Sequence, residues 1–139
     1  MLSSQTLYEI AKCRFQEAEI LLKNGKPDGA IYLSGYSIEL MLKRTIVMTL
    51  NWDGYPASKK EFEGKTSFKI HDLNLLLNFS GLEKELQADT ALYAKWQVAS
   101  SWESESRYTE IGKVTDLDAG DTIEATREVL NFILAKSKL

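Results

Sequence analysis

The chain has very little cysteine, histidine and proline: its 139 residues include one cysteine (Cys13), one histidine (His71) and two prolines. A single cysteine cannot form a disulfide within the chain, and with one histidine it cannot complete a Cys/His zinc site. We therefore expect no metal and no cofactor. A lone cysteine is typical of a reducing compartment, and the first residues contain no apolar run of signal-peptide length, which predicts a cytoplasmic protein.

An excess of positive charge is also missing. The 17 basic and 20 acidic side chains leave a net charge of -3, so nucleic-acid binding does not follow from the overall charge. Any contact with RNA would have to be local. The hydrophobic content of 44% in 139 residues is enough for one domain, and we expect a single helical domain over residues 1–139.

The sequence contains no strand pattern, because its apolar residues recur at intervals of three and four, as in helices. A first amphipathic helix is predicted from Ser3 or Ser4 to about Lys23. A second, from Gly29 to about Leu50, is apolar on nearly every face. Its three charges, Glu39, Lys43 and Arg44, argue against a membrane span, because charges near the middle of a bilayer are costly.

The second half of the chain is less regular. Gly, Pro, Ser and charged residues predict an exposed loop over Asn51 to Ser67, followed by a short helix over residues 69–79. A capping box at Ser80 and Glu83 predicts the start of a fourth helix, which extends to Trp102 and can break at Asp89. A last helix begins near Asp118 or Asp121. The fold class predicted is all-α, an up-and-down helical bundle of four to five helices.

The charged residues of the second helix are the first candidates for a site. A carboxylate on so apolar a helix is costly unless a partner satisfies it, and Arg107, beside Tyr108, is the partner that we expect for Glu39. The spacing of Glu39 and Lys43 also allows an ion pair along the helix. The Glu39–Arg107 pair is either a structural buried pair or part of a ligand-binding site, and the sequence leaves both open.

Other candidates have simpler interpretations. His71 and Asp72 are adjacent, so their side chains point in different directions, and such a pair more often caps a helix start than forms a catalytic unit. The aromatic residues of the fourth helix stand at helical spacing among leucines, which favours the core over base stacking. They are Tyr93, Trp96 and Trp102.

Three motifs in order resemble the HEPN family, small helical domains of prokaryotes and higher eukaryotes. The stretch AEILLKNGKPDGAIYLSGYSIELMLKR is similar to the family's hairpin of a leucine-rich helix, a small loop and A-x-Y-x-x-G-Y-x-x-E-x-x-L-K. His71-Asp72-Leu73 resembles the family's HDL helix start, and Trp102 with Arg107-Tyr108 resembles its W...RY segment. The hairpin matches are Ala30, Tyr32, Gly35, Tyr36, Glu39, Leu42 and Lys43.

This resemblance implies a helical bundle that is commonly dimeric and often encoded beside a minimal nucleotidyltransferase, as a toxin–antitoxin pair. Many members are metal-independent ribonucleases that use an arginine followed four to six residues later by a histidine. The present sequence departs from that pattern, because no histidine follows Arg107 and no arginine stands in the required window before His71. The ribonuclease activity therefore cannot be carried over to this chain.

Two functions follow as expectations. The first is a non-catalytic HEPN-like module that binds a partner protein, such as a minimal nucleotidyltransferase, or a nucleotide. It would act as a homodimer, with Glu39, Lys43, Arg107 and Tyr108 as ligand-binding residues. The second is an RNA endonuclease with an atypical active site around Arg107 and Tyr108, with a carboxylate or His71 in support.

Overall fold

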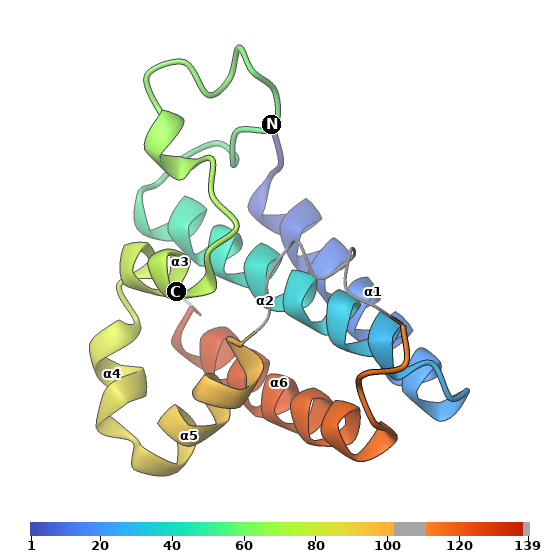
Figure 1. Ribbon diagram of the computed structural model, residues 1–139. Helices are drawn as coiled ribbons and strands as arrows, with labels where there is room; N and C mark the ends of the chain where they lie inside the picture. Colours follow the sequence, from blue (N-terminus) through green and yellow to red (C-terminus); the bar gives the residue numbers. More distant parts are fainter. Residues whose placement is uncertain (102–110, 138–139) are drawn as a thin grey trace.

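The computed structural model describes residues 1–101 and 111–137 and confirms the predicted all-α bundle. Helices α1 (Ser4–Lys23) and α2 (Pro27–Thr49) form an antiparallel hairpin (Figure 1). Ser3 caps α1 by accepting a hydrogen bond from the Thr6 amide at 3.1 Å. The turn between the helices contains Gly25 at φ 71°, a left-handed conformation that glycine adopts without steric cost.

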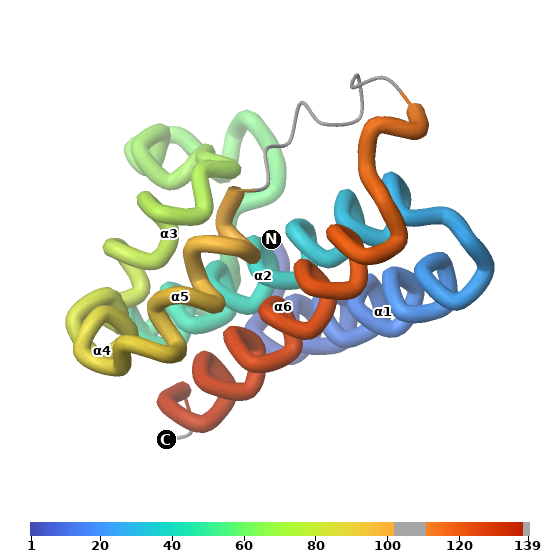
Figure 2. The backbone as a smooth tube through the Cα atoms, turned by 60° about the horizontal axis from the view of Figure 1, so that its bottom comes forward, coloured from blue at the N-terminus to red at the C-terminus, as the bar shows by residue number. Residues whose placement is uncertain are grey.

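Helix α2 is the central helix of the bundle, as its apolar sequence predicts. It packs against α1, against α3 (Leu73–Ser80) and against α6 (Asp116–Lys136). Figure 1 shows α2 between α1 and α6, and Figure 2 shows α6 crossing in front of the α1–α2 hairpin. Its residues Ile38, Leu42 and Ile46 are fully buried. A polar side chain on such a helix has few routes to solvent, which is why Glu39 needs partners from the protein.

The segment between α2 and α3 is more than the exposed loop that was predicted. Tyr55 is buried, and its backbone exchanges two hydrogen bonds with Leu2, of 2.7 and 2.8 Å. The segment ends in a 3-10 turn, η1 (Thr66–Phe68), and Trp52 lies edge-on to Phe68 with ring centroids 4.9 Å apart. The prediction missed this packing because Gly, Pro and charged residues surround the few aromatic residues that anchor the segment.

The predicted fourth helix is two helices, α4 (Glu83–Ala88) and α5 (Thr90–Ala99), so the described residues contain six α-helices. The break falls at Asp89, where the sequence allowed one, and the Asp89 carboxylate caps α5 by accepting from the Leu92 amide at 3.1 Å. The prediction of a capping box from Ser80 to Glu83 was wrong. Leu82 is the N-cap of α4, and the Ser80 hydroxyl accepts a hydrogen bond from the Leu82 amide.

The remaining predictions about helices hold with small shifts. Helix α6 begins at Asp116, a little earlier than predicted, because the Thr115 hydroxyl caps it. Trp96 is buried, as expected, and donates its indole N–H to Asn74. Tyr93 is half-buried and packs against the core. Trp102 lies outside the described residues. Within the described ranges, we find no helix with the length and apolar character needed to cross a membrane.

Candidate functional site

The most unusual group in the described structure is the Glu39 carboxylate, which lies in the middle of α2 with only 3% of its side chain exposed. One oxygen, Oε2, accepts a hydrogen bond from the Lys43 ammonium at 3.2 Å. The other, Oε1, lies 2.8 Å from Nδ1 of His71. Each carboxylate oxygen thus has its own nitrogen partner: the Lys43 ammonium balances the buried charge, and His71 satisfies the other oxygen by a hydrogen bond.

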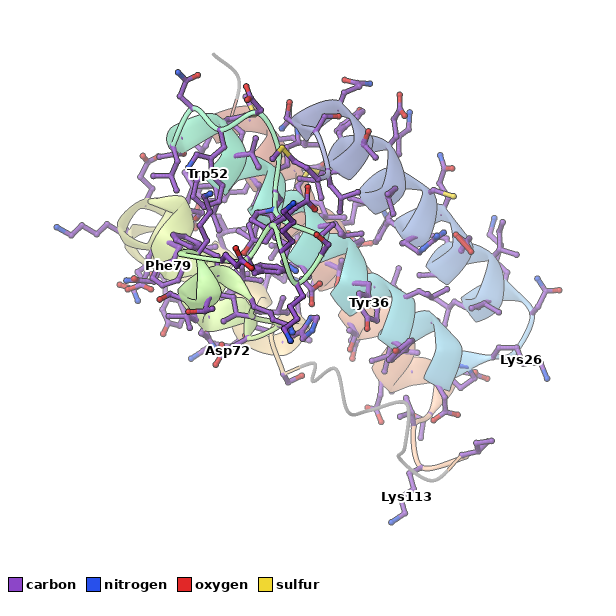
Figure 3. All side chains as sticks on the ribbon, turned by 90° about the horizontal axis from the view of Figure 1, so that it is seen from above. Lys26, Tyr36, Trp52, Asp72, Phe79 and Lys113 are labelled. Carbon is purple, nitrogen blue, oxygen red and sulfur yellow. The ribbon has the colours of Figure 1, made fainter. Side chains whose placement is uncertain are left out.

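These three side chains meet because two separate segments converge. Glu39 and Lys43 are one turn apart on α2, the spacing at which helical side chains face each other. His71 comes from a segment 32 residues away and stands just before Asp72, the N-cap of α3. Figure 3 shows the chain that leads into Asp72 lying over α2, next to the part of that helix that carries Tyr36.

The hydrogen bond between Glu39 and His71 determines the tautomer of the imidazole. An ionised carboxylate only accepts hydrogen bonds, so Nδ1 must carry the proton of this contact. When the ring is neutral, Nε2 then holds the lone pair. The His71 side chain is 56% exposed although its partner is buried, so the outer edge of the ring is accessible to solvent.

Tyr55 closes the inner side of the cluster. Its ring centroid lies 5.0 Å from the Lys43 ammonium, and its hydroxyl donates a hydrogen bond to the Phe68 carbonyl. Burial, and after it the negative charge of Glu39, raise the pKa of the Tyr55 phenol well above its ordinary value. Tyr55 is therefore a neutral packing and hydrogen-bonding group at physiological pH, and Lys43 is held between it and Glu39.

The structure places the predicted site residues as follows. Glu39 and Lys43 are together, as their spacing allowed. Arg107 and Tyr108 lie outside the described residues, so the expected pairing of Glu39 with Arg107 stays a prediction. The carboxylate nevertheless has two partners without that arginine.

The sequence interpretation named His71, in the HDL motif and in the endonuclease alternative, but missed its contact with Glu39, and it did not consider Tyr55 at all. Asp72 caps its helix as predicted, accepting from the Leu75 amide at 3.1 Å, while His71 turns away from it toward Glu39. Part of the signal for this contact was present, because a buried carboxylate requires a donor. The sequence did not show that His71, among the 17 basic side chains and the single histidine, would be one of its partners.

Hollows also lie elsewhere on the described surface. A groove of about 250 Å³ runs between α1 and α6 over Met41, with Phe15 and Leu130 among its walls. A wider hollow of about 610 Å³ lies beside Trp52 and mixes acidic and basic side chains. In the described part of the chain we find no group of three or more side chains arranged to hold a metal ion.

Comparisons with protein-family models, with curated proteins and with solved structures found no match to this chain. The HEPN resemblance therefore depends on the motif residues themselves.

Proposed function

We propose that this chain is a non-catalytic HEPN-like module that binds a partner protein, such as a minimal nucleotidyltransferase, or a nucleotide, and that acts as a homodimer. The observation that carries the proposal is the contact between two motifs. Glu39, from the hairpin motif, and His71, from the HDL motif, are 32 residues apart in sequence and meet at 2.8 Å. Motif residues that meet in space are expected if the motifs mark one inherited site.

The charges in this region favour a partner protein over a free nucleotide. Lys43 is only 12% exposed and its charge is committed to Glu39, so it has little capacity left for phosphate. The Arg44 guanidinium lies over the Tyr8 ring, 5.4 Å from its centroid. In this proposal Arg107 supplies any further positive charge, and Tyr108 and the exposed edge of His71 supply contact area.

The nucleotide part of the proposal is tested by calorimetric titration with ATP, GTP and short RNAs. Binding that Arg107→Ala abolishes would support it, provided that Arg14→Ala leaves binding intact. Arg14 is a suitable control because it forms an exposed ion pair with Glu17 within α1. If titration with millimolar ATP, GTP or RNA releases no heat of binding, the nucleotide part of the proposal is overturned. The partner-protein part is tested independently.

The partner part is tested with the neighbouring gene. If a minimal nucleotidyltransferase is encoded there, the two proteins should copurify when they are expressed together. The homodimer is tested separately by light scattering, which should show two copies of this chain in the free protein. A monomer that does not retain the nucleotidyltransferase would contradict the partner proposal.

A second function, an RNA endonuclease with an atypical site around Arg107 and Tyr108, is favoured by one observation. Glu39 orients the His71 imidazole, and an oriented imidazole is the group that a general base would require, although His71 stands outside the usual motif. The test is cleavage of a structured RNA by the wild type, with loss of cleavage in folded Arg107→Ala and His71→Asn. Intact RNA after prolonged incubation with the wild type would end this alternative.

A further inference from the structure

His71 has three features that together distinguish it from an ordinary surface histidine. Its Nδ1–H is held by a buried carboxylate at 2.8 Å, its side chain is 56% exposed, and it is the only histidine of the chain. The first feature leaves the lone pair on Nε2 in the neutral ring, and the second makes that edge of the ring accessible to other molecules.

We propose that Nε2 of His71 is a nucleophile that accepts a phosphoryl group from a small activated donor, a phosphoramidate or an acyl phosphate. This inference does not depend on the proposed function. It assigns a covalent modification site to the outer edge of the imidazole, opposite the bond to Glu39.

The surrounding charges suit a phosphoryl group. The donor is an anion, and a bare carboxylate behind the ring would repel it. The Lys43 ammonium, 3.2 Å from Glu39, balances that carboxylate, so the approaching anion meets a neutral pair. Lys69, two residues before His71, is exposed and adds a positive charge to the same segment. Asp72, next to His71, is also exposed, but its carboxylate accepts from the Leu75 amide at the start of α3.

Glu39 also stabilises the phosphorylated imidazole that the transfer produces. In the transfer, the Nε2 lone pair forms an N–P bond while the bond from phosphorus to the leaving group breaks. The leaving group takes that electron pair and, for phosphoramidate, departs as ammonia after protonation by water. The ring that results keeps its proton on Nδ1 and becomes cationic, and the Glu39 carboxylate stabilises this positive charge. An acyl group is a poorer fit, because an acylated imidazole hydrolyses quickly at so exposed a site.

The test uses the intact chain and potassium phosphoramidate, and follows the mass of the protein and the position of the phosphoryl group by phosphorus NMR. We expect one acid-labile phosphoryl group, on Nε2 and not on Nδ1, and none on His71→Asn. A matched control carries His71→Asn together with Gln97→His, which places a histidine on the exposed face of α5 with no acidic residue one turn away. The wild type should react about tenfold faster than this control, the low end of the effect that orienting carboxylates have on metal-binding histidines.

The variant Glu39→Gln tests the mechanism. A glutamine side chain either accepts from Nδ1–H or donates to Nδ1, so it no longer determines the tautomer of His71. It also carries no negative charge to stabilise the cationic ring of the product. The rate of phosphorylation should therefore fall to that of the control. A wild-type rate equal to the control, or phosphorylation at Nδ1, would overturn the proposal. If Glu39→Gln does not fold, the rate comparison and the position of the phosphoryl group still decide it.

Discussion

At the scale of single residues, the site is determined by how one buried charge is satisfied. Glu39 is compensated by Lys43, which is nearly as buried, and by His71, which is more than half exposed. Removing the carboxylate leaves the Lys43 ammonium on an apolar helix without its partner. A buried charge that loses its partner destabilises a protein more than the pair stabilised it.

We therefore expect Glu39→Leu to lower the free energy of unfolding by about 3 kcal/mol, the low end for a buried pair because Lys43 retains some solvent contact. The double variant Glu39→Leu with Lys43→Met removes both charges and should recover most of that loss. Urea denaturation of the two variants and the wild type measures both values. A double variant less stable than the single one would show that the pair is not the reason for the loss.

Tyr55 gives the site a dependence on alkaline pH. Its pKa is raised in the folded protein by burial and by Glu39, so the folded state keeps the phenol proton after the unfolded state has lost it. Its contribution to stability is complete below the ordinary tyrosine pKa of about 10 and is lost as the pH rises beyond that value toward the folded pKa.

We expect Tyr55→Phe to cost about 1 kcal/mol at neutral pH, because the hydrogen bond to the Phe68 carbonyl is lost. The difference from the wild type should shrink as the pH rises above about 10. Denaturant unfolding at neutral and alkaline pH measures it. A difference that stays constant or widens would contradict the raised pKa.

At the scale of helices, side-chain caps determine where the chain changes direction in its second half. One apolar pattern runs through α4 and α5, and Asp89 divides it by accepting from the Leu92 amide. The same device starts α3 at Asp72 and α6 at Thr115. The sequence allowed a break at Asp89 without requiring one, and it misplaced the cap of α4, because a Ser-x-x-Glu spacing does not by itself orient the serine.

Asp89→Ala should lower stability by about 1 kcal/mol, the usual cost of losing an N-cap. Asp89→Asn, whose side-chain oxygen still accepts from the Leu92 amide, should stay close to the wild type. Thermal unfolding followed by circular dichroism compares the three proteins. Equal losses in both variants would mean that the charge of Asp89, and not its cap, holds the junction.

At the scale of the whole molecule, the N-terminal residues hold the segment after α2 against the bundle. Gly54 is buried under them, and a Cβ atom there would lie 2.8 Å from the Leu2 carbonyl oxygen. This contact and the Leu2–Tyr55 hydrogen bonds keep Tyr55 over Lys43, so the packing at one end of the chain supports the cluster around Glu39.

Gly54→Ala should therefore destabilise the protein by about 1–3 kcal/mol, as overpacking does. It should also speed amide hydrogen exchange at Leu2 and Tyr55. Gly120→Ala is the matched control: its Cβ meets nothing within 4 Å in helix α6, and alanine should stabilise that helix by up to about 1 kcal/mol. Unchanged exchange at Tyr55 in Gly54→Ala would show that the N-terminal contact is not what holds the segment.

The sequence by itself determined the helical class, the central position of α2 and the need of Glu39 for partners, because these follow from the periodicity of apolar residues and from the cost of burying a charge. Only the tertiary structure decided that His71 is one of those partners and that Tyr55 covers Lys43. The physical reason is distance along the chain. Helical patterns act between residues three or four apart, whereas the contact of Glu39 with His71 depends on how an irregular segment packs back over α2 before it enters α3.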